Sequence, residues 1–159
     1  MKIHQKEKGF TIIEVVLVLA IAGLIFLMVF IALPALQRSQ RDTQRKNDLS
    51  RLTSALTSYT SNNRGSLPDP TSTFVVGDWT SFESHYLTSS GDKFTDPSGT
   101  DYTFKEGPAD STAKFDASSP NIYVTNGAVC NGESTQAGAV RNVAFQMVLE
   151  GNGVACQNN

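Results

Sequence analysis

The residues of this chain best suited to chemistry lie where an apolar run begins, in Lys8-Gly9-Phe10-Thr11-Ile12-Ile13-Glu14. Glu14 is followed by a stretch, Val15 to Gln37, that contains no charged residue. A helix of about 20 apolar residues crosses the hydrocarbon core of a bilayer. A carboxylate within such a span costs up to about 3 kcal/mol at mid-membrane and less near the interface. We therefore expect Glu14 to have a functional partner.

The segment from Gly9 to Glu14, with a short basic stretch before it and an apolar helix after it, resembles the N-terminus of type IV pilins and pseudopilins. In that family a dedicated peptidase cuts after the glycine on the cytoplasmic face. The new N-terminal phenylalanine is commonly methylated, and the subunit then polymerises into a filament. The resemblance, which covers roughly the first third of the chain, implies that residues 1–9 are a leader that is removed and that Phe10 begins the mature chain.

The same resemblance implies that Glu14 is the glutamate that directs filament assembly. Cleavage creates a terminal amine on Phe10, which is charged near neutral pH. A neighbouring subunit's Glu14 would neutralise that amine, and because an unpaired buried charge costs several kcal/mol, the pair would set the register between subunits. In the alternative interpretation, Glu14 is a solvated acid at the lipid headgroup boundary.

Cys130 and Cys156 are the two cysteines of the chain. If oxidised, they close a loop of about 27 residues, worth roughly 3 to 4 kcal/mol in the chain-entropy account. Pilin-like heads are often pinned by a C-terminal disulfide, so the resemblance implies the same bond here. Two free buried thiols are the alternative.

Signatures of other chemistry are weak in this sequence. His85 is the sole histidine after residue 9, and the scattered aspartates do not follow the spacing of a calcium loop. Some pseudopilins bind calcium in the head, so a calcium site at Asp96 or Glu150 remains an alternative, and otherwise we expect no cofactor. The sequence has no phosphate loop, zinc-protease motif or nucleophile elbow, and we expect that it is not an enzyme.

The elements that would position these residues begin with one long helix, predicted from Phe10 to Asn63. At 1.5 Å per residue it would be about 80 Å long. Residues 10–36 are apolar on all sides and form the transmembrane and assembly half. Gly23 and Pro34 interrupt that half. Both residue types are tolerated in transmembrane helices, so in one interpretation they produce only a mild bend. In the other, they let the helix bend or partly melt when it leaves the membrane for a filament.

Residues 37–63 form the amphipathic half of the helix. Their apolar side chains recur at helical spacing and predict the surface on which a head packs: Leu49, Leu52, Leu56 and Tyr59, with Ala55 beside them. The helix should end at Asn63, with Gly65 as its C-terminal cap.

Residues 64–159 are predicted to form a globular head, with a connector at 64–100 and a β-sheet at 101–159. Trp79, Phe82 and Tyr86 indicate a short helix in the connector. The sequence predicts a hairpin from Ile122 to Val129, closed by Asn126-Gly127. Three or four antiparallel strands should lie on the helix, in an α+β fold, and the strand candidates are Tyr102–Lys105, Asn121–Thr125 and Val140–Leu149.

Charge is unevenly distributed along the chain, whose net charge is −2. After Arg51 there are five basic and eleven acidic residues, which argues against a nucleic-acid partner for the head. A basic cluster precedes this acidic part of the chain, and we interpret it as a solvated helix face, with polyanion binding as the alternative. The cluster consists of Arg38, Arg41, Arg45, Lys46 and Arg51, against Asp42 and Asp48.

Orientation and location follow from the leader motif. Counting basic residues near both ends of the span would place the head in the cytoplasm. The motif implies the opposite, and two cysteines suit an oxidising compartment. A secretory signal cut at Ala20-Ile21-Ala22 is a competing interpretation, but the apolar run continues well past that site to Leu36. We expect a membrane precursor with an extracytoplasmic head, followed by a surface or periplasmic filament.

The function expected from these features is structural. The chain would be processed after Gly9 and polymerise with copies of itself into a type IV pilus-like filament. The resemblance implies a prepilin peptidase, an assembly platform and a motor as partners. The alternatives are a pseudopilin of a type II secretion or competence system, a minor pilin, and a single-pass anchored domain that binds a ligand.

Overall fold

The computed structural model describes residues 9–69, 74–89, 91–110, 112–151 and 153–159. It divides into two compact units, residues 1–37 and residues 38–159, which are described separately below. The chain has the predicted α+β fold class, with a long N-terminal helix and small β-sheets.

Helix α1 runs from Ile12 to Asn62 and continues through Pro34. At its C-terminal end the amide of Gly65 donates to the carbonyl of Thr60 at 2.7 Å, the bond of a Schellman motif. The residue in the left-handed position of that motif is Arg64, with φ 57°, and Gly65 follows with φ 83°. The helix therefore ends within a residue of the predicted place, but Arg64 occupies the capping position assigned to Gly65.

In the first unit, the large apolar side chains of α1 are exposed from Ile12 to Leu36. Among the described residues of this unit, no other element covers them. By length and composition α1 contains a segment that is able to cross a membrane. An all-round apolar helix requires lipid or other helices around it.

The second unit contains a four-stranded sheet in the order β1-β2-β5-β6. The pairs β2–β5 and β5–β6 are antiparallel, whereas β1 runs parallel to β2. Strands β3 and β4 form a separate two-stranded sheet. The bounds of the strands are Thr103–Glu106 (β1), Asn121–Asn126 (β2), Ala128–Asn131 (β3), Ser134–Ala137 (β4), Val143–Val148 (β5) and Val154–Asn158 (β6).

Three details differ from the sequence-based expectation. The predicted hairpin is wrong, because β2 pairs with β5 and β3 pairs with β4, although Gly127 does adopt the turn conformation, with φ 69°. The sheet is mixed, since β1 and β2 are parallel. The last strand candidate begins too early, because Val140 is 88% exposed in a turn and β5 starts at Val143.

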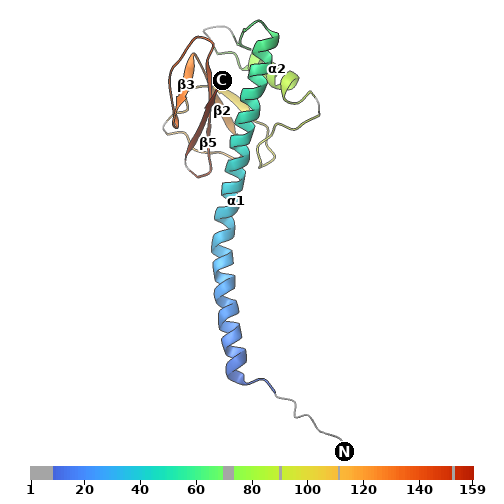
Figure 1. The fold of residues 1–159 in the computed structure, drawn as a ribbon, viewed down its shortest axis with the longest axis vertical. Coiled ribbons are helices and arrows are strands. Elements are labelled where there is room, and N and C mark those ends of the chain that lie inside the picture. The colour runs from blue at the N-terminus through green and yellow to red at the C-terminus, as the bar shows by residue number, and fades with distance from the viewer. Residues whose placement is uncertain (1–8, 70–73, 90, 111, 152) are drawn as a thin grey trace, which may run out of the picture. The chain divides into compact units, whose positions relative to one another are not determined.

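The core of the second unit lies between the amphipathic part of α1, the four-stranded sheet and helix α2, Val76–Tyr86. Figure 1 shows β2 and β5 alongside this part of α1. The predicted helix stripe is buried, with Leu52 and Leu56 fully inaccessible to solvent. Trp79 from α2 is also fully buried and contacts the rings of Phe82, Phe104 and Phe145. The predicted short helix and the stripe on α1 are therefore confirmed as core elements.

Candidate functional site: the processing segment and a buried ion cluster

The first turn of α1 carries a reciprocal capping box. The carboxylate of Glu14 accepts a hydrogen bond from the backbone N–H of Thr11 at 2.9 Å. The N–H of Glu14 donates in return to the hydroxyl of Thr11 at 3.4 Å, and that hydroxyl donates to the carboxylate at 2.8 Å. Two N–H groups that a helix start leaves unpaired are thereby satisfied. Sequence reasoning missed the capping role of Thr11, although threonine-x-x-glutamate before an apolar run is a local capping-box signal that the sequence contains.

The capping box leaves part of the Glu14 carboxylate available. Both hydrogen bonds that it accepts end on Oε2, and among the described residues Oε1 has no hydrogen-bond partner. An exposed carboxylate oxygen at a helix start, in an apolar segment, is suited to receive a cationic group from another molecule. The monomer therefore holds Glu14 in a fixed position without using its full capacity as an acceptor.

The two helix breakers of the first unit lie inside regular helix. A Cβ built on Gly23 would meet no atom within 4 Å, so nothing in the unit itself requires glycine there. Pro34 lies in the continuous helix of α1. Their role in a change of the helix stays a prediction.

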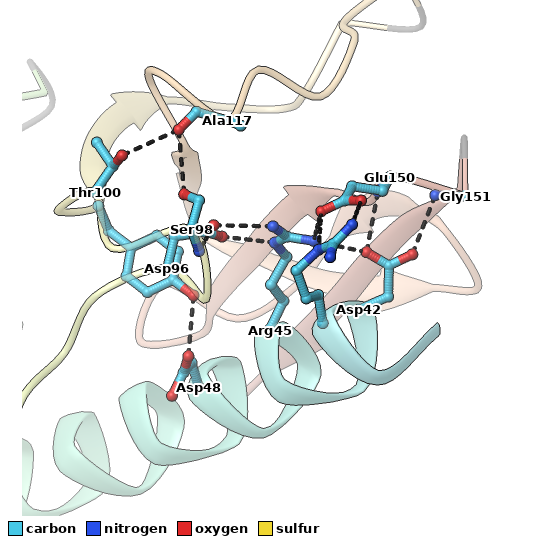
Figure 2. A network of polar contacts seen from close by, with 11 residues as sticks. Asp42, Arg45, Asp48, Asp96, Ser98, Thr100, Ala117, Glu150 and Gly151 are labelled. Carbon is cyan, nitrogen blue, oxygen red and sulfur yellow. Dashed lines mark hydrogen bonds and ion pairs between the residues drawn. The ribbon is translucent and has the colours of Figure 1, made fainter. Parts of the chain in front are cut away.

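In the second unit, Arg45 lies at the centre of a cluster of carboxylates, and its side chain is fully buried. Its Nε and Nη2 donate to the two oxygens of Asp96 at 2.6 and 2.9 Å, a bidentate pair. Its Nη1 donates to Asp42 and to Glu150, each at 2.9 Å. The guanidinium carbon also lies 4.1 Å from the centroid of the Phe115 ring. Figure 2 shows the guanidinium between Asp96 on one side and Asp42 and Glu150 on the other.

The cluster joins α1 to two distant loops. Asp42 accepts the backbone N–H groups of Glu150 and Gly151, at 3.0 and 3.1 Å, in the turn between β5 and β6. Arg41 binds Glu150 with two hydrogen bonds, of 2.8 and 2.6 Å. Asp96 belongs to the loop before β1. Charged hydrogen bonds of this kind fix the position of α1 relative to both loops.

The cluster shifts the titration of its members. Hydrogen bonds from Arg41, with help from Arg45, lower the pKa of Glu150 to about 2. Burial alone would raise the pKa of Asp96, but hydrogen bonds from Arg45 and Ser98 outweigh it and hold that pKa below its ordinary value. Burial opposes the charge of Arg45 as well, yet its bonds to Asp96 and Glu150 raise its pKa. These carboxylates are therefore charged at neutral pH.

Next along α1, Asp48 accepts a hydrogen bond from the hydroxyl of Tyr102 at 2.9 Å. Burial raises the pKa of Asp48, while the bonds from Tyr102 and Arg51 act in the opposite direction. Burial and the nearby Asp48 raise the pKa of Tyr102. A second polar contact thus joins the same face of α1 to the segment before β1.

These contacts correct part of the expectation of a solvated basic face, since Arg38, Lys46 and Arg51 are exposed as predicted. Arg45 and Asp48 are buried, since the loop at Asp96 and the turn at Glu150 cover this part of α1. Both carboxylates considered as calcium ligands, Asp96 and Glu150, accept hydrogen bonds from arginine. Within the part of the chain that the structure describes, no group of three histidine, cysteine or acidic side chains is arranged to hold a metal ion.

Two further groups complete the polar inventory. Cys130 and Cys156 form a disulfide that links β3 to β6, so it joins the two sheets. Glu83, on α2, is half-buried, and burial together with the charge of Asp101 raises its pKa to about 7.

Comparison with known proteins bears on the N-terminal segment. Residues 4–30 match the prokaryotic N-terminal methylation motif. This stretch includes Gly9, Phe10, Glu14 and Gly23, and the resemblance inferred from these residues is confirmed as the prepilin signature. No curated protein and no solved structure matches the chain.

Proposed function

We propose that this chain, which carries the prepilin signature of type IV pilins and pseudopilins, is a structural subunit of a type IV pilus-like filament and is cleaved after Gly9. The observation that carries the proposal is the position of the methylation motif. It lies at the start of a helix whose large apolar side chains are exposed from Ile12 to Leu36. Such a helix needs a partner at every stage. Lipid fills that role in the precursor, and sister helices fill it in the filament.

The physical mechanism is helix exchange between two apolar environments. Transfer from lipid to a helix bundle gives little hydrophobic gain, because lipid tails are as apolar as leucine. Close packing between helices, polar pairing and an external motor must therefore favour extraction. The motor, the membrane platform and the peptidase are implied by the resemblance, and the peptidase acts on the bond between Gly9 and Phe10.

Glu14 supplies the directional part of the assembly. Cleavage converts the amide nitrogen of Phe10 to a charged amine, and in this proposal Oε1 of Glu14 on a neighbouring subunit accepts a hydrogen bond from it. The capping bonds of Thr11 hold the carboxylate still while it does so. Since an unpaired charge in the bundle is costly, only the register that joins these two groups is stable.

The head, in this proposal, is the exported part that coats the filament. Its ion cluster around Arg45 and its disulfide hold α1, the sheet and the loops together when the subunit is pulled from the membrane. Adhesion, motility and DNA uptake are the roles that exported heads of this family serve, and we propose no nucleic-acid partner for this acidic head.

The experiment compares Glu14→Leu, Glu14→Gln and the unchanged chain for subunit recovered in sheared surface filaments. We expect filaments from the unchanged chain and a severe loss with both variants, while all three are cleaved after Gly9. The control is Glu83→Gln, which removes an acid from the head and leaves assembly intact. Normal filaments from Glu14→Leu would refute the pairing.

Abundance in the same preparations separates the finer assignments. A subunit that forms the bulk of the filament is a major pilin. A subunit found in traces on filaments, or confined to the periplasm, is a minor pilin or a pseudopilin of a secretion or competence system. A cleaved chain that remains single in the membrane would support an anchored ligand-binding domain instead.

A further inference from the structure

A basic groove lies beside the first turns of α1 in the second unit. Its volume is about 660 Å³, and Arg38, Arg41, Ser98, Lys114, Phe115 and Glu150 are among the residues that line it. The groove is open to solvent and lies against the ion cluster, since Arg41 and Glu150 belong to both.

Two cations that line this groove form no salt bridge with any residue that the structure describes. The carboxylate of Glu150 is bound by Arg41 and Arg45. The carboxylate of Asp116, also in the lining, accepts the hydroxyl and the N–H of Ser118. Among the described residues, neither Arg38 nor Lys114 forms a salt bridge, and both side chains are exposed. The groove therefore offers a guanidinium and an ammonium group to an external anion.

The place of Arg38 in the chain indicates which anion it meets. Arg38 follows Leu36, the last apolar residue of the run, by two positions. A helix from Val15 to Leu36 is about 33 Å long, which matches the thickness of about 30 Å of a hydrocarbon core. When that helix crosses a bilayer, Arg38 lies at the level of the lipid phosphates. Lys114 lines the same groove as Arg38.

We propose that this groove binds the phosphate group of an anionic phospholipid while the chain is anchored in the membrane. The inference rests on the membrane-bound precursor stage of the proposed function. Arg38 and Lys114 form charge-assisted hydrogen bonds to the phosphate oxygens, and each favours an anionic over a neutral lipid by roughly fivefold. The groove holds the head against the membrane surface and releases it when the subunit is extracted.

The test uses the full chain in vesicles of phosphatidylcholine, with and without phosphatidylglycerol, and measures the rate of amine acylation at each lysine by mass spectrometry. Phosphatidylglycerol should slow the labelling of Lys114 by roughly fivefold or more. Lys105 is exposed on β1 and outside the groove, so its rate should change little. Arg38→Gln should remove most of the protection at Lys114, whereas the charge-matched variant Lys46→Gln should retain it.

Several results would overturn the proposal. Equal labelling of Lys114 in both vesicles shows that no lipid binds there, and equal slowing of Lys105 shows a general surface potential. Protection by free glycerol phosphate in neutral vesicles, to the same degree, assigns the groove to a small soluble anion. If Lys114 stays fully protected from acylation in Arg38→Gln, a phosphate site formed jointly by Arg38 and Lys114 is excluded. Flotation of the chain with both vesicle types reports anchoring separately, so a failure of lipid selection is distinguishable from a failure of membrane insertion.

Discussion

Replacing Arg45 by methionine should destabilise the head more than any other single change of charge on α1. The substitution keeps an apolar stem of similar length and removes the guanidinium. Arg45 and the side chain of Asp96 are both fully buried, and among the described residues Arg45 is the only cation that forms a salt bridge with Asp96. In the variant, the Asp96 carboxylate retains the N–H of Ser98 as a donor but loses its counter-charge.

The expected loss follows from that geometry. Breaking a buried ion pair by removing one partner costs about 3 to 5 kcal/mol. Asp42 and Glu150 are only about 15% exposed and lose a shared donor as well. The guanidinium of Arg45 also contacts the Phe115 ring, and such a contact is worth about 2 kcal/mol when desolvated. The loss of this contact is already included in the expected loss of about 3 to 5 kcal/mol and is not added to it.

The measurement is urea unfolding of the full chain in detergent micelles, followed by fluorescence. Trp79 is the sole tryptophan and is fully buried in the head core, so it reports unfolding of the head. The matched control is Arg51→Met, because Arg51 is 42% exposed and pairs with Asp48 at 3.2 Å. An exposed pair of that kind is worth at most about 1 kcal/mol.

A double variant sharpens the comparison. Arg45→Met with Asp96→Asn removes the buried negative charge together with its partner, and it should recover at least about 1 kcal/mol of the loss. If Arg45→Met costs no more than Arg51→Met, or if the double variant is as unstable as the sum of the two single variants, the cluster does not stabilise the head in the way that its geometry indicates.

Three other outcomes can be checked. Because the pKa of Glu83 is raised to about 7, the stability that its protonated form contributes is complete below about pH 4.5 and is lost as the pH rises through 7. At pH 8, Glu83→Gln should therefore have a free energy of unfolding about 1 to 3 kcal/mol higher than that of the unchanged chain, whereas the two should be equal at about pH 4. An unchanged urea midpoint at pH 8 would contradict this. Reduction of the Cys130–Cys156 bond should lower the unfolding free energy by about 3 to 4 kcal/mol in the same assay, and a reductant without effect would refute the entropic argument. Thr11→Ala should speed amide exchange in the first turn of α1 by roughly fivefold, by loss of a cap worth about 1 kcal/mol, whereas equal exchange would show that Glu14 holds the turn alone.

The features that the sequence predicted are those that depend on local pattern. The apolar run, the stripe from Leu49 to Leu56 and the turn at Gly127 each follow from spacing over a few residues. The start of α1 was predicted at Phe10 but lies at Ile12, and the local signal threonine-x-x-glutamate would have indicated it more closely.

The features that the sequence did not predict depend on contacts between distant segments. Arg45 meets Asp96 and Glu150, which follow it by 51 and 105 residues. No local pattern separates such an arginine from a solvated one. The pairing of β2 was missed for the same reason, since a turn signal at Gly127 fixes a change of direction but does not choose between β3 and β5 as partner.

The most direct measurement is the N-terminal sequence of the chain recovered from surface filaments, together with the mass of its first residue. We expect a subunit that begins at Phe10, carries a methyl group on its amine and is found in filaments. A chain that still contains residues 1–9, and that is dispersed singly in the membrane, would contradict it.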